Sequence, residues 1–267
     1  MTLHIYGAID GAVVVMSDGR TTYEHRAPDN NVQKFVTYSL TASAGGGTES
    51  DSFQPGDFAA VLMVQNRASF NPIGRPQDEH RATAAEVVVK SLQDPALQCS
   101  DVSELGDAVW KAIENRWLES CGMCADLADR RRRGTDGGEV CEHEDYDDGG
   151  FTLLIAAIND PRYQGPVHYV RERLDFRLDV ATLGNLEIHF SGPIGENPIR
   201  MSGDVTTNDD KRILAEMAAA FRLQARNPSA TPEWAEWAQT VGGTIRTVVL
   251  DPRTGFRLLE SFDLDGH

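Results

Sequence analysis

The chain has 267 residues, 40% of them hydrophobic, and a formal net charge of −16 at pH 7, with 25 Lys and Arg residues against 41 Asp and Glu residues. This apolar content supports a folded core, and the length fits a single domain with or without an inserted module. The acidic balance argues against nucleic acid and against an anionic membrane surface as partners, because both require clusters of basic side chains. No apolar run approaches the ~20 residues of a membrane span, and the N-terminal residues lack the pattern of a signal peptide, so we expect a cytoplasmic protein.

The N-terminal residues predict a β-hairpin over 2–16. Both halves of this segment are apolar and rich in β-branched side chains, and Asp10-Gly11 between them is a turn dipeptide that tolerates positive φ. Because almost no polar residue interrupts the two strands, we expect both faces of the hairpin to be buried. Residues 32–43 predict a further pair of strands, and the glycine-rich stretch 44–48 predicts a flexible turn.

Helical patterns follow in the middle of the chain. Residues 77–93 and 101–119 each place apolar side chains on one face of a helix, and Asp101 with Glu104 has the spacing of a capping box. The segment 121–150 that comes next is highly charged and rich in glycine. We therefore expect it to be an insertion into the domain.

Strands predominate again after this insertion. We expect four strands at 151–158, 166–170, 175–182 and 185–190. Two helices at 209–225 and 232–240 and a closing hairpin at 244–262 are expected to follow. The whole order is strands, helices, strands, helices, strands. It predicts a layered α+β fold with helices outside two sheets, because alternating βαβ units would give a different order.

Thr2 is a candidate nucleophile. If Met1 is removed, which a small second residue permits, Thr2 carries a free α-amine, a base of pKa about 8, beside its own hydroxyl. A nearby ammonium would lower the pKa of that amine and stabilise an oxyanion, and a carboxylate would hold the ammonium in place. Asp18 lies 16 residues after Thr2, and Lys34, one of four lysines in the chain, lies 16 residues after Asp18. A hairpin and one further strand of these lengths would bring all three to the same end of a sheet.

These residues resemble the proteasome β-subunit family of N-terminal-nucleophile hydrolases, and the first 34 residues are most similar to bacterial proteasome-like protease subunits. The resemblance rests on Thr2, on the segment 10–22 and on Asn-Val-x-Lys at 31–34. It implies an α+β fold of the four-layer αββα sandwich type. It also implies one proteasome-like domain over 1–267, into which the charged loop at 121–150 is inserted.

The resemblance also assigns residues to a catalytic site. The six residues are the nucleophile Thr2, its activating pair Asp18 and Lys34, the oxyanion donor Gly45, and Ser191 with Gly192 as supports of the Thr2 amine. One departure from the family is clear. The Asp-x-x-Ser sequence that the family places before its final Gly-Gly is absent, since the chain there reads Trp-Ala-Gln-Thr-Val-Gly-Gly.

The reaction implied by the resemblance is amide hydrolysis by a threonine peptidase. Peptide or protein substrates, a homo-oligomeric ring and an ATPase regulator are the partners it implies, and no cofactor is expected for catalysis. Two other functions stay open at this point. The chain could be a catalytically inactive structural subunit of such an assembly, or a stand-alone amidase or acylase that acts on a small molecule.

Three of the four cysteines lie in the insertion. Cys121-x2-Cys124 and Cys141-x-His143 offer three thiolates and an imidazole, which is the donor set of a structural zinc site. The second pair is closer in sequence than is usual in zinc sites, so a solvated loop with incidental cysteines is the alternative. If zinc is bound, a third function is open, in which the insertion is an interaction module that binds partners.

Overall fold

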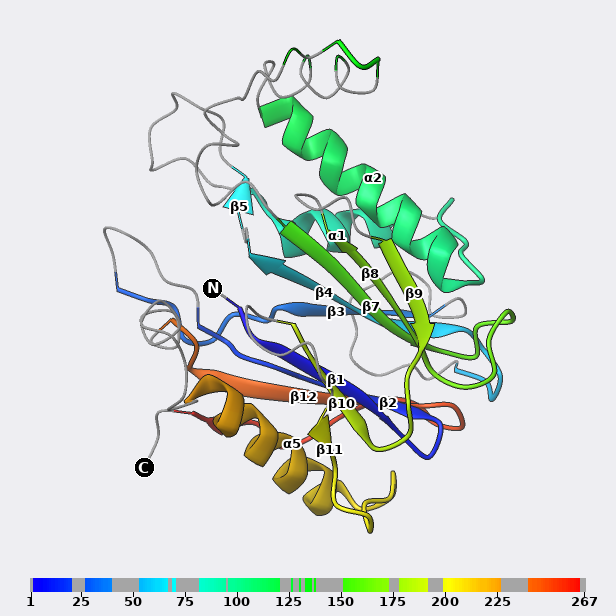
Figure 1. Cartoon of the computed structure of the whole chain (residues 1–267), viewed down its shortest axis with the longest axis vertical. Coiled ribbons are helices and arrows are strands. Elements are labelled where there is room, and N and C mark those ends of the chain that lie inside the picture. The colour runs from blue at the N-terminus through cyan, green and yellow to red at the C-terminus, as the bar shows by residue number, and fades with distance from the viewer. Residues whose placement is uncertain are drawn as a thin grey trace.

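Two antiparallel β-sheets lie face to face in the computed structural model, with helices against their outer faces (Figure 1). The start of β1 lies at the edge of the layer between the two sheets. The structure describes residues 2–20, 27–39, 53–66, 69–70, 82–94, 96–120, 126, 130, 133–135, 137, 151–172, 178–191, 199–226 and 240–264.

The first sheet has seven strands in the order β11-β10-β1-β2-β12-β13, with β14 also paired to β12. Its strands are β1 (His4–Ile9), β2 (Ala12–Ser17), β10 (Glu187–Ser191), β11 (Ile199–Arg200), β12 (Thr244–Asp251), β13 (Gly255–Leu258) and β14 (Phe262–Asp263). β1 and β2 form the predicted hairpin, and its turn residues Asp10 and Gly11 have φ of 48° and 82°. Every residue of β1 and β2 is buried, as their apolar sequences predict.

The second sheet has five strands in the order β3-β4-β7-β8-β9. Its strands are β3 (Phe35–Ser39), β4 (Ala59–Asn66), β7 (Phe151–Ile158), β8 (Val167–Glu172) and β9 (Leu178–Thr182), and a separate short pair consists of β5 (Ser69–Phe70) and β6 (Ala82–Thr83). The layer between the two main sheets is apolar and includes Val13, Val15, Val61, Leu154, Ala156 and Val248. Burial of these apolar side chains from both sheets holds the sandwich together.

Helices pack on both outer faces. α1 (Ala84–Leu92) and α2 (Val102–Ser120) cover the five-stranded sheet, and α5 (Asp210–Ala225) covers the seven-stranded sheet (Figure 1). On α5, Ile213, Met217 and Phe221 repeat at helical spacing and are fully buried. Among the described residues, no helix has both the length and the apolar character needed to cross a bilayer.

The prediction of a four-layer αββα sandwich is wrong. Within the described residues the chain is mostly β-sheet, and one outer face carries a single helix where a full layer was expected. Amphipathic periodicity identifies a helix, but it does not show how much of a sheet the helix covers. The predicted helix at 232–240 lies outside the described residues except for its last residue, and most of the insertion at 121–150 lies outside them as well, so both stay predictions.

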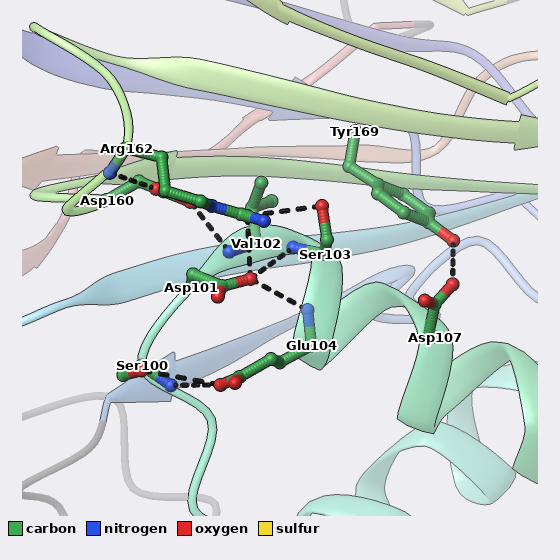
Figure 2. A network of polar contacts seen from close by, with 9 residues as sticks. All are labelled: Ser100, Asp101, Val102, Ser103, Glu104, Asp107, Asp160, Arg162 and Tyr169. Carbon is green, nitrogen blue, oxygen red and sulfur yellow. Dashed lines mark hydrogen bonds and ion pairs between the residues drawn. The ribbon is translucent and has the colours of Figure 1, made fainter.

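The first turn of α2 is capped as the sequence predicts. The Asp101 carboxylate accepts the backbone N–H groups of Ser103 and Glu104 at 2.9 and 2.8 Å (Figure 2). The Glu104 carboxylate reaches back and accepts the N–H of Ser100 at 3.1 Å. The two bonds to Asp101 satisfy helix N–H groups that have no partner within the helix.

A second carboxylate ties this helix end to the turn after β7. Asp160 is buried, and its carboxylate accepts the N–H of Val102 at 2.8 Å (Figure 2). Arg162 contacts both this group and Asp101, with Nη2 at 3.3 and 2.6 Å from the two carboxylates. The network therefore fixes α2 against the sheet.

Gly106 lets α2 approach β8 closely. A Cβ at this position would lie 2.5 Å from the ring of Tyr169, which is itself fully buried. The ring is also held by its hydroxyl, which donates to Asp107 Oδ1 at 3.2 Å.

We predict that Gly106→Ala lowers the free energy of unfolding by about 1–3 kcal/mol, because overpacking outweighs the gain of about 0.5–1 kcal/mol that alanine usually gives in a helix. Urea denaturation measures the change. Gly203→Ala is the matched control, since a Cβ there meets no atom within 4 Å. Equal stability of the two variants would show that Tyr169 does not confine this helix position.

Candidate functional site

Thr2 lies directly before β1, at the end of the sheet where β2 finishes, and it is buried. The pairing of β1 with β2 continues for one residue beyond the strands, because the N–H of Asp18 donates to Leu3 O at 3.2 Å. In return, the N–H of Leu3 donates to Asp18 Oδ1 at 2.9 Å. The hairpin therefore brings the Asp18 carboxylate against the residue that follows Thr2.

Lys34 pairs with the other oxygen of this carboxylate. Its Nζ lies 2.9 Å from Asp18 Oδ2, and the two side chains are 7% and 0% exposed. The ammonium also donates to the backbone oxygen of Arg20, and the N–H of Arg20 donates to Asp18 Oδ2 at 3.2 Å. Burial lowers the pKa of Lys34 from its ordinary value, and the attraction of Asp18 opposes that shift. The pair is thus a compact, desolvated cation and anion next to Leu3, the residue that follows Thr2.

A row of polar side chains crosses the seven-stranded sheet at this end. In the strand register Arg246 lies opposite Ser17, Ser17 opposite His4, and His4 opposite Ser191. Side chains alternate along a strand, so Ser17 shares the face of Val15, which packs between the two sheets. The layer between the sheets is therefore apolar in its interior and polar at the end where Thr2 lies.

His4 and Ser191 contact β4 of the opposite sheet. His4 Nε2 lies 3.2 Å from the backbone oxygen of Val64, and Ser191 Oγ donates to Gln65 Oε1. A carbonyl only accepts, so Nε2 carries the proton and Nδ1 of His4 is an acceptor. This Nδ1 is buried and finds no hydrogen-bond partner among the residues that the structure describes. Burial lowers the pKa of His4 to about 3, so the ring is neutral at pH 7.

Three rings lie one step further along the sheet. The hydroxyl of Tyr6 is 3.1 Å from Nδ1 of His168, and the ring of Tyr6 stacks on that of His189 with centroids 5.6 Å apart. Tyr6 and His189 are opposite one another on β1 and β10. This aromatic group separates the polar end from the apolar interior of the layer.

Of the residues predicted to form the site, Asp18 contacts Lys34 and also contacts Leu3, the residue that follows Thr2. Ser191 lies at the same end of the layer, but its hydroxyl donates to Gln65. The remaining predicted residues, Gly45, Gly192, Cys121, Cys124, Cys141 and His143, lie outside the described part of the chain, and the zinc site stays a prediction. Within the described part, no cluster of three or more His, Cys, Asp or Glu residues is arranged to hold a metal ion.

Three polar residues at this end were not predicted from the sequence. His4 was open to detection, because it is two residues after Thr2 and therefore shares its face of a strand. Gln65 and Arg246 come from β4 and β12, which are distant in sequence from Thr2. Nothing local in the sequence indicates that these strands meet there.

Comparison with known proteins gives a likeness of fold. No family model matches the sequence, and no curated protein matches it. The Anbu complex of Pseudomonas aeruginosa, solved as a helical assembly, matches over 99% of this chain and 88% of that chain, with 13% identity and a TM-score of 0.50. Anbu from Hyphomicrobium sp. strain MC1 matches over 98% and 87%, with 12% identity and a TM-score of 0.47. Anbu (ancestral beta-subunit) from Yersinia bercovieri matches over 98% and 88%, with 11% identity and a TM-score of 0.46.

The predicted assignment to the proteasome β-subunit family, nearest to bacterial proteasome-like protease subunits, is wrong. The structures named above are Anbu proteins, and no comparison at the level of sequence supports the assignment. The segment 10–22, on which the resemblance depended, combines an Asp-Gly turn with a β-branched strand, and many hairpins need such a sequence. Its pattern describes a hairpin without specifying a family.

We predict that His4→Gln flattens the acid side of the stability curve. The unfolded ring has a pKa of about 6.5 and the folded ring about 3, so between these values only the unfolded chain binds this proton. The wild type therefore loses stability as the pH falls through this range, by up to about 1.4 kcal/mol per pH unit. The glutamine amide still donates to Val64 O but does not titrate. Urea unfolding from about pH 7 to pH 4.5 measures the difference, and parallel curves for the two proteins would contradict it.

Proposed function

We propose that the chain is a threonine-type amide hydrolase whose nucleophile is Thr2, exposed by removal of Met1. The observation that carries this proposal is the double contact of one buried carboxylate. Asp18 Oδ1 accepts the N–H of Leu3 and Asp18 Oδ2 accepts Nζ of Lys34, each at 2.9 Å. One anion thus fixes both the residue that follows Thr2 and a desolvated ammonium.

The chemistry follows from this arrangement. The α-amine of Thr2 accepts the proton of the Thr2 hydroxyl while the oxygen attacks the carbonyl carbon of an amide. Lys34 keeps the amine unprotonated near neutral pH and stabilises the negative charge that forms on oxygen. The amine then gives its proton to the leaving nitrogen, which leaves an ester on Thr2. Water, deprotonated by the same amine, hydrolyses the ester and restores the hydroxyl.

Peptides or proteins are the proposed substrates, and further copies of the chain are the proposed partners. The support for self-assembly is the likeness in fold to the Anbu of Pseudomonas aeruginosa, which forms a helical assembly. Closure of copies into a ring and the presence of an ATPase regulator stay predictions.

We predict that a threonine-directed β-lactone adds once to the purified protein. Intact mass spectrometry should give the mass without Met1, plus one adduct that is absent in Thr2→Ala. Lys34→Met should slow the adduct by about 100-fold or more, because it removes the charge that acts on both the amine and the oxyanion. Lys90→Met is the matched control, since Lys90 is exposed on α1 and should leave the rate unchanged.

Retained Met1 without an adduct would overturn the proposal and favour a catalytically inactive structural subunit. An adduct that persists in Thr2→Ala would place the nucleophile elsewhere in the chain. Equal rates of adduct formation in Lys34→Met and Lys90→Met would show that the ion pair does not take part in the reaction.

A further inference from the structure

Lys34 reaches Asp18 from a segment without regular secondary structure, residues 30–34. Two backbone hydrogen bonds hold this segment: the N–H of Val32 donates to Gly19 O at 2.9 Å, and the N–H of Thr244 donates to Asn30 O at 2.8 Å. The segment therefore lies between the residues that follow Asp18 and the start of β12.

Two glycines allow the three backbones to come this close. A Cβ on Gly19 would lie 2.5 Å from Thr244 O, and a Cβ on Gly243 would lie 2.5 Å from Asn30 O. Gly243 also has φ of 71°, which side chains rarely adopt. The backbone of β12 is thus in direct contact with the segment that delivers Lys34.

Arg246 adds a side-chain clamp to this contact. Its Nη1 donates to Val32 O at 3.2 Å, and its Nη2 donates to Asn31 O at 3.1 Å and to Asn31 Oδ1. A planar guanidinium can hold two successive carbonyls in this way, whereas a lysine ammonium is a single flexible point charge. Arg246 lies opposite Ser17 in the strand register, and Ser17 directly precedes Asp18. One side chain therefore joins the strand pair that presents Asp18 to the segment that presents Lys34.

We propose that Arg246 is a positioning residue that holds Lys34 in register with Asp18 and Thr2. The inference rests on the proposed function, in which the Lys34 ammonium sets the proton affinity of the Thr2 amine. Without Arg246, segment 30–34 keeps its backbone bonds to Gly19 and Thr244. Asn31 and Val32 lose the three hydrogen bonds that the guanidinium donates to them. The ammonium then spends less time against Asp18 and Thr2, and its effect on the amine declines.

The test is the pH dependence of β-lactone addition in four proteins: wild type, Arg246→Lys, Arg246→Met and Arg257→Met. Arg246→Lys keeps the positive charge but loses the planar guanidinium and its paired N–H donors. It therefore separates positioning of Lys34 from the electrostatic effect of a lost cation. Arg257 is the matched control, because its Nη2 donates to Thr207 O at 2.7 Å and pairs with Asp210 at 2.7 Å, against α5. Both Arg246 variants should slow addition by about 10- to 100-fold.

The acid limb of the profile distinguishes positioning from general instability. In both Arg246 variants it should move to higher pH, because a more distant Lys34 lets the pKa of the Thr2 amine rise toward its ordinary value of about 8. A variant that only loses stability should react more slowly at every pH, with no shift in the pH of the acid limb. This unshifted limb is the result expected for Arg257→Met. A wild-type rate and limb in Arg246→Lys would overturn the inference.

Amide hydrogen exchange separates this inference from the proposed function. The amide of Val32 should exchange faster in Arg246→Met than in wild type, while Arg257→Met should leave it unchanged. If the wild type forms no adduct, the proposed function fails, and the exchange rates still decide whether Arg246 holds the segment. Identical exchange rates of the Val32 amide in all four proteins would contradict the inference that Arg246 holds segment 30–34.

Discussion

The buried ion pair between Asp18 and Lys34 is the interaction on which this end of the molecule depends. Two charges with side chains 0% and 7% exposed lose nearly all contact with water, and their mutual attraction offsets that cost only if both are held in place. Four hydrogen bonds do so: Leu3 and Arg20 donate to the carboxylate, and Lys34 donates to Asp18 and to the Arg20 carbonyl. Removing one partner would leave an isolated buried charge, which typically costs about 3–5 kcal/mol.

The layer between the two sheets supplies the environment for this pair. Its interior is filled by apolar side chains from both sheets, which fix the distance between the sheets. At the end beside Thr2 the same faces carry Ser17, His4 and Ser191 from one sheet and Gln65 from the other. The helices pack outside, and the carboxylate network at the start of α2 joins that helix to the far face of the five-stranded sheet. The apolar interior of the layer and the polar end that carries the proposed chemistry are therefore two parts of the same layer.

Local features of the sequence predicted local structure well. The Asp10-Gly11 turn, the buried hairpin around it and the capped start of α2 are confirmed, because residues adjacent in sequence determine each of them. The spacing of Asp18 and Lys34 pointed to two residues that contact each other, and Asp18 also contacts Leu3, which follows Thr2. The catalytic roles of Thr2, Asp18 and Lys34 stay predictions. What failed depended on distant pairing: the extent of the helical layers and the approach of β4 and β12 to the site. The family assignment failed for a related reason, since its most specific segment is also what a tight hairpin requires.

The ion pair is proposed to lower the pKa of the Thr2 amine, and measuring that pKa tests the proposal most directly. A nitrogen-15 NMR titration of the protein without Met1 would follow the amine in wild type and in Lys34→Met. We predict a pKa of the amine below the ordinary value of about 8 in wild type, and a rise of this pKa toward that value when the ammonium is removed. An amine that titrates at about 8 in both proteins, or a Thr2 that never becomes the N-terminal residue, would contradict it.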